Sequence, residues 1–398
     1  MNITKTYYSF VLFKDFGIAF TFASFVPFLL SIGLTYGEVA LVNAIFAGTI
    51  FLAELPTGML ADGKSRAWSM RIGVWLWILG AFVYFCAQGF WTAAFADAIL
   101  GIGSAFLSGA RQAWITDALA RYGRSSELRQ VFATETMLRG IACVFGGSLG
   151  VFLSLIHLRL IWLPAIFGPI ISLVIAYKFI NGDGEPIERI TEKEAFKRSV
   201  ILLRRSPSLL WVLGLLIVFG GVMAFNHYWA PYFEEQVGRA SLAFLWPMIY
   251  GSCTFAGSVM RCVKTKVGQE GNIIVFALFL TGTSLLLVKF IPWIWMVVAF
   301  VAIHEFGRGV FAVAIDSFVQ HRVESSYRAT FGSLQSFIAH IGLALVPLIV
   351  WVALTGKPNT SETIEMLWFI SGAIMAGVAI LFFLFKPKDV CATEIEEE

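Results

Sequence analysis

Apolar residues divide the chain into twelve long runs separated by short polar stretches. The runs cover residues 8–32, 37–60, 68–89, 91–117, 130–154, 159–180, 209–233, 241–263, 272–290, 293–319, 329–354 and 364–385. A helix that crosses a bilayer needs roughly 20 mostly apolar residues, and each run is about that long. Because the apolar residues are continuous rather than alternating, the pattern predicts an all-α integral membrane protein with twelve transmembrane helices and not a β-barrel.

The longest polar interval, residues 182–207, separates six of these runs from the other six. It begins with a stretch rich in Gly and Pro, which is typical of a linker. It continues with Thr191–Lys197, whose charged residues predict an amphipathic helix lying along the cytoplasmic membrane surface. We therefore expect two six-helix bundles, residues 1–181 and 208–386, joined by this linker and followed by an acidic cytoplasmic tail, residues 387–398.

The composition excludes a soluble globular protein. Of the 398 residues, 58% are hydrophobic and 14% are charged, and the mean hydropathy is +0.79, whereas soluble domains are about 25% charged. The net charge of +3 gives no sign of a nucleic-acid partner. The five cysteines are scattered, so neither a disulfide framework nor a zinc site is expected. The first run is preceded by no cleavage site, so we expect it to act as its own signal and to stay in the protein.

Lysine and arginine are distributed unevenly among the polar segments between the runs. If the N-terminus lies inside, the inner segments hold 21 of the 29 Lys and Arg residues and the outer segments hold 4. The four outer residues are Arg159, Arg239, Lys289 and Lys357. Because basic loops remain on the cytoplasmic side of a membrane, we expect both termini in the cytoplasm.

The two halves of the chain match each other at an offset of 199 residues. At this offset the matching pairs are Gly58 with Gly257, Asp117 with Asp316, Arg129 with Arg328, and Phe132 with Phe331. The aspartates and arginines of these pairs bound the inner loop between the fourth and fifth runs of each half. Landmarks repeated at equivalent loops predict two parallel repeats of six helices each.

The polar loop after the second run contains Gly58, Asp62 and Arg66. Their spacing resembles the loop signature of the major facilitator superfamily, which reads roughly Gly-x-Leu-Ala-Asp-Arg-x-Gly-Arg. Gly63 and Ser65 depart from this signature, because the family has Arg and Gly there. The segments Ser108–Asp117 and Trp229–Phe233 are similar to parts of the fourth and seventh helices of bacterial drug-exporting members. The resemblance implies two pseudo-symmetric bundles that alternate access to a site near the membrane midplane.

Ionisable residues within the apolar runs are the first candidates for function, because a charge in hydrocarbon costs on the order of several kcal/mol. We expect the following acids and imidazoles to couple protons to transport: Asp15, Glu135, Glu305, His304 and His340. We expect a second group to line the substrate cavity: Arg111, Arg139, Arg308, Ser104, Ser108, Asn226 and His227. The alternative is that these residues only hold helices together.

Helical spacing indicates which of these residues share a face. The fourth run places Asp97, Gly101, Ser104, Ser108 and Arg111 on one side. Asp97 is near the outer end, where we expect it to meet water. Glu135 and Arg139 are one turn apart, with the acid first. Asp15 and Arg111 lie at similar depths from the cytoplasmic side, so an Asp15–Arg111 pair is geometrically possible.

The family resemblance also implies a cytoplasmic gate made of loop charges that close the inner side while the outer side is open. The residues at matching positions are Gly58, Asp62, Arg66, Asp117, Arg129, Asp316 and Arg328. The alternative is that these charges only fix the orientation of the chain in the membrane.

Two further patterns bear on packing. Glycines at four-residue spacing, such as Gly146 and Gly150, predict helices that approach one another closely. The segment Phe225–Trp229 mixes aromatic and polar side chains, which predicts either a cavity wall or an interfacial aromatic belt.

Together these features predict a secondary active transporter of the bacterial inner membrane. The resemblance to drug exporters implies proton-coupled efflux of a small amphipathic organic compound. One alternative is a proton-coupled uptake symporter for a nutrient or an anionic metabolite. Another is a membrane sensor or enzyme that transports nothing. We expect a monomer whose partners are a small molecule, protons and the bilayer, with no nucleic acid, no metal and no cofactor other than the proton gradient.

Overall fold

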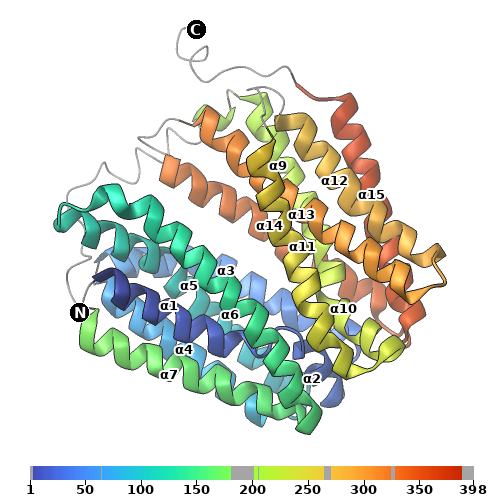
Figure 1. Ribbon diagram of the computed structural model, residues 1–398, viewed down its shortest axis with the longest axis horizontal. Helices are drawn as coiled ribbons and strands as arrows, with labels where there is room; N and C mark the ends of the chain where they lie inside the picture. The colour runs from blue at the N-terminus through green and yellow to red at the C-terminus, as the bar shows by residue number, and fades with distance from the viewer. Residues whose placement is uncertain are drawn as a thin grey trace. The chain divides into compact units, whose positions relative to one another are not determined.

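The computed structural model describes residues 3–63, 65–180, 201–204, 206–263, 270–323 and 328–387. These ranges contain helices, turns and loops and no strand (Figure 1). Eleven helical stretches within them are long and apolar enough to cross a membrane. The amphipathic helix predicted around Thr191–Lys197 and the acidic tail lie outside the described residues.

The helices follow the predicted runs closely. The first seven are α1 (Ile3–Ala19), α2 (Phe25–Ser31), α3 (Tyr36–Gly63), α4 (Arg66–Cys86), α5 (Phe90–Arg121), α6 (Leu128–Ile156) and α7 (Trp162–Phe179). The others are α9 (Pro207–Phe219), α10 (Met223–Val237), α11 (Leu242–Cys262), α12 (Glu270–Leu287), α13 (Ile294–Arg322), α14 (Arg328–Leu354) and α15 (Ser361–Leu384). Short 3₁₀ turns at 125–127, 158–161, 220–222, 239–241 and 288–290 join some of them.

The first predicted run is not one helix, because the chain leaves the helical path between α1 and α2. Thr21 donates a side-chain hydrogen bond to the carbonyl of Ile18, which offers the backbone an alternative to helical bonding. Pro27 then lies in the first turn of α2, where its missing N–H group is not needed. The first span is therefore α1 and α2 in succession.

The chain forms two compact units. Unit 1 contains the described residues of 1–188, 230–247 and 351–359, and unit 2 contains those of 189–229, 248–350 and 360–398. This division follows contacts and so assigns parts of the second half of the chain to unit 1. The predicted bundle boundaries, which divide the chain at the linker, stay a prediction.

Helix pairing repeats in the two units. In unit 1, α4 packs against α5 and α7. In unit 2, the helices at the corresponding places in the order pair in the same way, with α12 packed against α13 and α15. Unit 1 also pairs α1 with α6 and α7, and these three run side by side in Figure 1. The same neighbours in both units are what an internal repeat predicts.

Glycines allow the closest of these approaches. A Cβ atom added at Gly150 of α6 would lie 1.9 Å from the carbonyl oxygen of Phe20, next to the break after α1. In unit 2, a Cβ atom at Gly342 of α14 would lie 2.5 Å from the carbonyl oxygen of Ile217 in α9. Both distances are too short for any side chain, so the predicted close approach at Gly150 is confirmed.

Two of the basic residues predicted on the outer side cap helix ends in unit 1. Arg159 donates to the carbonyl of Phe85 at 2.7 Å, and Arg239 donates to that of Ser154 at 3.4 Å. Both carbonyls belong to the last turn of a helix, where no intrahelical donor is present. A guanidinium there also interacts favourably with the helix dipole, which gives these two arginines a structural role.

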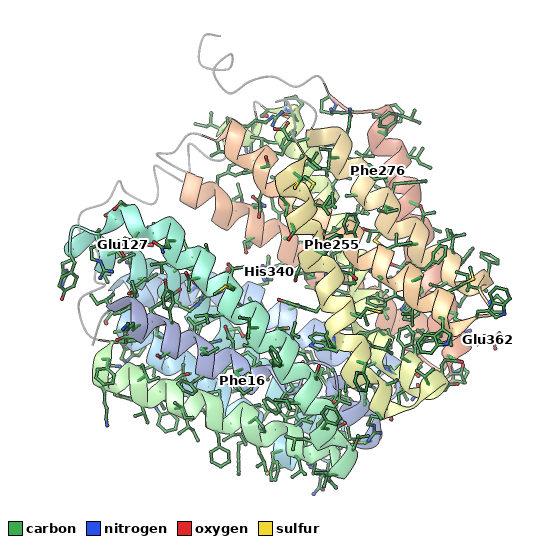
Figure 2. All side chains as sticks on the ribbon, in the orientation of Figure 1. Phe16, Glu127, Phe255, Phe276, His340 and Glu362 are labelled. Atoms are coloured by element: carbon green, nitrogen blue, oxygen red, sulfur yellow. The ribbon has the colours of Figure 1, made fainter. Side chains whose placement is uncertain are left out.

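Large apolar side chains lie on the surface of the helices, as Figure 2 shows for Phe255 and Phe276. Each of these two is 62% exposed. Exposing so much apolar surface to water is unfavourable, whereas lipid acyl chains solvate it well. The exposed apolar side chains are therefore consistent with helices that span a membrane.

We expect Gly150→Ala to destabilise the protein by about 1–3 kcal/mol, because the new methyl group would overlap the backbone of Phe20. Gly140→Ala is the matched control on the same helix, since a Cβ atom there meets nothing within 4 Å. Thermal unfolding of the purified variants measures the difference. Equal midpoints for the two variants would contradict this account of the contact.

Candidate functional site

A buried hydrogen-bonded triad joins three helices of unit 1. Arg111 of α5 donates through Nη1 to Glu135 Oε1 of α6 and, at 3.2 Å, to the hydroxyl of Tyr7 in α1. Tyr7 in turn donates to Glu135 Oε2 at 2.5 Å. All three residues are buried. Both oxygens of the carboxylate are therefore bound, one by a cation and one by a neutral hydroxyl.

A second ion pair extends this triad along α1. Arg139 of α6 binds Asp15 Oδ2 through Nε at 2.9 Å, and Lys14 binds Asp15 Oδ1. Arg139 Nη1 is also 4.0 Å from Glu135 Oε1, which links the two groups. We call the six residues Tyr7, Lys14, Asp15, Arg111, Glu135 and Arg139 the unit 1 network. It holds three cations and two anions.

The ion pair considered between Asp15 and Arg111 is not the arrangement in the structure. Asp15 binds Arg139 and Lys14, while Arg111 binds Glu135. Similar depth in the membrane does not determine how each helix is rotated about its axis, and this rotation decides which side chains meet. The arginine of α6 occupies the place beside Asp15.

The unit 1 network lies deep in the spanning part of the chain. Arg139 follows the start of α6 by eleven residues, which is about 16 Å along the helix. Its side chain is 51% exposed, in contrast to 5% for Glu135 and 11% for Arg111. Since a guanidinium exposed to hydrocarbon is costly, we conclude that the open side of Arg139 faces water.

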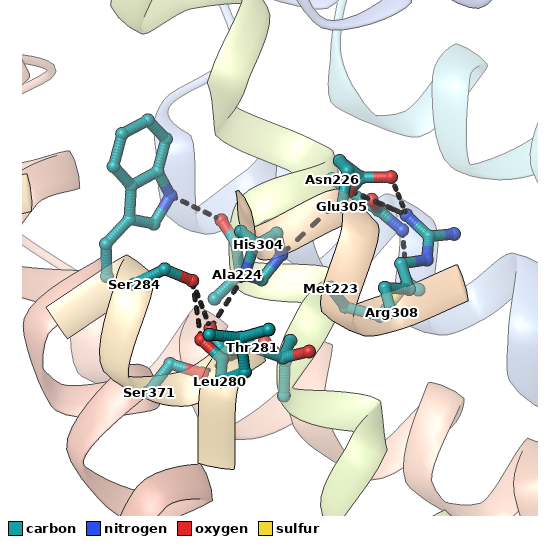
Figure 3. A network of polar contacts seen from close by, with 12 residues as sticks. Met223, Ala224, Asn226, Leu280, Thr281, Ser284, His304, Glu305, Arg308 and Ser371 are labelled. Carbon is teal, nitrogen blue, oxygen red and sulfur yellow. Dashed lines mark hydrogen bonds and ion pairs between the residues drawn. The ribbon is translucent and has the colours of Figure 1, made fainter. Parts of the chain in front are cut away.

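Unit 2 holds a smaller polar network on α10 and α13 (Figure 3). Arg308 donates to Asn226 Oδ1 at 2.7 Å and to Glu305 Oε1 at 3.1 Å. His304 contacts the carbonyl of Thr281 through Nδ1 at 2.9 Å, and its Nε2 is 3.9 Å from Glu305 Oε1. His304 and Glu305 are buried, whereas the Arg308 side chain is 31% exposed.

The carbonyl partner determines the tautomer of His304. A carbonyl oxygen only accepts hydrogen bonds, so Nδ1 carries the proton in this contact. In the neutral ring Nε2 then bears the lone pair and faces Glu305.

The remaining predicted cavity and proton residues join neither network. His340, labelled in Figure 2, binds the carbonyl of Ser336 one turn earlier in its own helix. Ser108 donates to the carbonyl of Ala105, and Ser104 is half-buried. His227 is buried, and its Nδ1 atom has no partner among the described residues.

One expectation about the outer ends of the helices is wrong, and so is one of the two alternatives given for Phe225–Trp229. Asp97 does not meet water there but is 4% exposed, because α3 and α4 cover α5 and the buried Tyr84 of α4 lies beside its carboxyl group. The aromatic residues Phe225, Tyr228 and Trp229 form no interfacial belt, since each is at most 4% exposed. In these cases packing against other helices, which the local sequence does not reveal, decides exposure.

The predicted gate is described in part. Arg66 is fully buried at the start of α4, where it binds Asp117 Oδ2 and donates to the carbonyl of Ala113 at 2.9 Å. Gly58 is exposed, and a Cβ atom there would meet nothing within 4 Å. Asp316 accepts a 3.4 Å hydrogen bond from Gln335. The side chains of the other predicted gate residues lie outside those described: Asp62, Arg129 and Arg328.

Unit 2 contains an ion pair at the place that corresponds to Arg66–Asp117, with the charges exchanged. Glu270, the first residue of α12, lies 3.7 Å from Arg322, the last residue of α13. An acid at a helix start and a base at a helix end are favoured by the helix dipoles, whereas Arg66 and Asp117 oppose them. The helix dipoles therefore add to the stability of the Glu270–Arg322 pair and oppose the Arg66–Asp117 pair.

Sequence reasoning missed Tyr7, Glu270 and Arg322. Tyr7 precedes Lys14 and Asp15 by about two turns, so helical spacing could have placed it on their face. Glu270 and Arg322 lie at helix ends rather than within apolar runs, and only the fold brings them together. Within the described ranges, no group of three or more His, Cys, Asp or Glu side chains could hold a metal ion.

Comparisons with known proteins agree with this architecture. A sequence profile described as the Major Facilitator Superfamily matches residues 8–347. The nucleoside transporter NupG is similar in structure, with a TM-score of 0.78, 12% sequence identity, and coverage of 98% of this chain and 100% of that one. No curated protein matches the chain in sequence.

Two other solved structures have the same fold. A bacterial homologue of the human lysosomal transporter Spinster has a TM-score of 0.71 and 14% identity, covering 96% of this chain and 94% of its own. A bacterial homologue of the iron transporter ferroportin has a TM-score of 0.73 and 15% identity, covering 96% and 98%. At such identities the likeness shows the fold.

We expect Arg111→Gln to destabilise unit 1 by about 3–5 kcal/mol, because it leaves Glu135 buried without its cation. Arg139→Gln should cost less than about 1 kcal/mol, since its side chain is half-exposed. Thermal unfolding in detergent compares them. The double variant Arg111→Gln/Glu135→Gln should recover part of the loss, and no recovery would mean that the arginine acts through packing alone.

Proposed function

This chain belongs to the major facilitator superfamily, and we propose that it is a proton-coupled secondary active transporter that exports a small amphipathic organic compound. Family membership makes it a transporter with multiple membrane-spanning helices rather than an enzyme. Proton coupling and the direction of transport go beyond the family, and they are supported by the residues described above and by the resemblance of Ser108–Asp117 to drug exporters.

The observation that carries proton coupling is the shared carboxylate of Glu135. Its ionised form accepts from Arg111 and Tyr7, and both partners come from other helices. Protonation removes the charge that holds Arg111 in place, so the three helices are held together less tightly. Conversely, a movement that separates Arg111 from Glu135 makes the proton easier to bind. Proton binding and helix movement are thereby linked, as alternating access requires.

The neighbouring pair Asp15–Arg139 can act in the same way. Asp15 holds Arg139 and Lys14 together, and its side chain is 15% exposed, so it is more accessible to water than Glu135. A proton that enters from the water beside Arg139 would reach Asp15 first and Glu135 second. In unit 2, the His304–Glu305 pair is a second place where one proton can be held.

The inner gate is proposed to be the Arg66–Asp117 pair. Because both charges oppose the helix dipoles, the pair gains no stability from them. A contact of this kind separates more readily than Glu270–Arg322, which we propose to be a permanent clasp between α12 and α13. We further propose a monomer in a bacterial inner membrane with both termini in the cytoplasm.

A second candidate function is proton-coupled uptake of an anionic nutrient or metabolite. The observation that favours it is the excess of one positive charge in the unit 1 network, which suits a negatively charged cargo. The two candidates differ in the direction in which a proton gradient drives the cargo.

Reconstituted vesicles with an internal pH dye test the proposal. Candidate cargoes are added from a panel of dyes, antibiotics, nucleosides and organic acids. In vesicles that hold the unmodified protein, we expect a transported cargo to drive protons across the membrane in the direction opposite to its own export. Glu135→Gln should reduce proton movement at least about tenfold by removing the titrating group. Glu127→Gln is the matched control, since Glu127 at the start of α6 pairs only locally with Arg124.

Proton movement that is unchanged in Glu135→Gln would contradict the role of this carboxylate. Cargo movement in the same direction as the protons would favour uptake over export. Cargo movement that ignores an imposed pH gradient altogether would contradict proton coupling.

A further inference from the structure

We propose that the cargo of this transporter carries a negative charge and that the guanidinium of Arg139 binds it. This inference rests on the transport function proposed above and names the chemical class of its substrate. The class is an organic anion with a planar or tetrahedral acidic group, such as a carboxylate, sulfonate or phosphate.

The first argument is the charge of the unit 1 network. Its cations are Lys14, Arg111 and Arg139, and its anions are Asp15 and Glu135. These five are joined to one another by the ion pairs of the described residues, and one positive charge is left over. An uncompensated charge at this depth is unfavourable, so a bound anion would lower the free energy of the site.

The second argument identifies which cation carries the excess. Arg111 is bound by Glu135 and Tyr7, and its side chain is 11% exposed. Lys14 is paired with Asp15, and its side chain is also 11% exposed. Arg139 is 51% exposed and uses Nε for its close contact with Asp15. Its Nη1 atom lies 4.0 Å from Glu135 Oε1, which is beyond hydrogen-bond distance. The terminal nitrogens of this guanidinium are therefore the part of the network that is open to a ligand.

The third argument is the geometry of the acceptor. A guanidinium presents five N–H groups in a rigid plane, and this fork matches two oxygens of a carboxylate, sulfonate or phosphate. Arg139 keeps one edge on Asp15 and can offer the other edge to such a group. Arg139 would then lie between the carboxylate of Asp15 and the acidic group of the cargo.

The fourth argument concerns the protons. The groups that face Arg139 are Tyr7, Lys14 and Asp15 from α1, Arg111 from α5, and Glu135 from α6. A proton on Glu135 raises the net charge of the network from one to two positive charges. Anion affinity should therefore rise as the pH falls, by about tenfold for one proton. By the same linkage a bound anion raises the affinity of these acids for protons.

Ligand-dependent thermal unfolding of the detergent-purified full chain tests this inference. Three probes share one cyclohexylmethyl group and carry an anionic, a neutral and a cationic head group: cyclohexylmethanesulfonate, cyclohexylmethanesulfonamide and cyclohexylmethylammonium. The sulfonate stays ionised between pH 6 and 8, so changes with pH belong to the protein. We expect the sulfonate to bind at least about tenfold more tightly than the other two, and more tightly at pH 6 than at pH 8.

Variants assign the effect to its residues. Arg139→Gln should abolish the preference for the sulfonate, and Arg139→Lys should keep the preference but weaken binding, because the charge remains and the fork is lost. Glu135→Gln mimics the protonated acid, so it should bind the sulfonate more tightly at pH 8 and lose most of the pH dependence. Arg159→Gln is the control, since Arg159 caps a helix end outside the network.

The inference is overturned if the sulfonate gives no saturable shift, if the neutral or cationic probe binds as tightly, or if Arg139→Gln keeps the preference. Should Arg139→Gln fail to fold, unweakened sulfonate binding in Arg139→Lys has the same meaning. The measurement imposes no proton gradient. A failure of proton-driven movement in vesicles would therefore contradict the proposed function without deciding the charge of the cargo.

Discussion

A charge inside a membrane must find a partner, and this requirement organises the polar part of the structure. Glu135 can lie in the spanning part of α6 because Arg111 and Tyr7 come to it from two other helices. The surfaces of these helices are otherwise mostly apolar and would pack against many alternatives. The need to pair the carboxylate selects one arrangement of α1, α5 and α6, since any other leaves a buried charge without compensation.

Pairing of charges would not suffice if the helices could not approach. Gly146 and Gly150 allow α6 to contact the end of α1 with almost no space between the backbones, and this contact lies about two to three turns beyond Arg139 on the same helix. Gly220 and Gly342 provide a comparable contact in unit 2. The two units therefore use one construction, in which glycines set the helix separation and a few polar groups set the register.

The same construction accommodates different electrostatics in the two units. Unit 1 has a linked group of five charges with one positive charge in excess, and unit 2 has one carboxylate, one guanidinium and a histidine. At the ends of α4 and α5 the charges oppose the helix dipoles, and at the ends of α12 and α13 they follow them. With such differences, the Arg66–Asp117 pair of unit 1 can separate and re-form under the proposed mechanism while the Glu270–Arg322 pair of unit 2 stays closed.

The sequence by itself determined the membrane class, the twelve runs, the repeat and most of the ionisable residues that pair within the spanning helices, because hydrophobicity and the cost of intramembrane charge are local properties of each segment. It also led to the Arg66–Asp117 pair through the resemblance of its loop motif. The partners of Asp15, the burial of Asp97 and the role of Tyr7 were decided only in the tertiary structure. The reason is that a helix of known length and depth can still rotate about its axis, and only packing against its neighbours determines which way each polar side chain points.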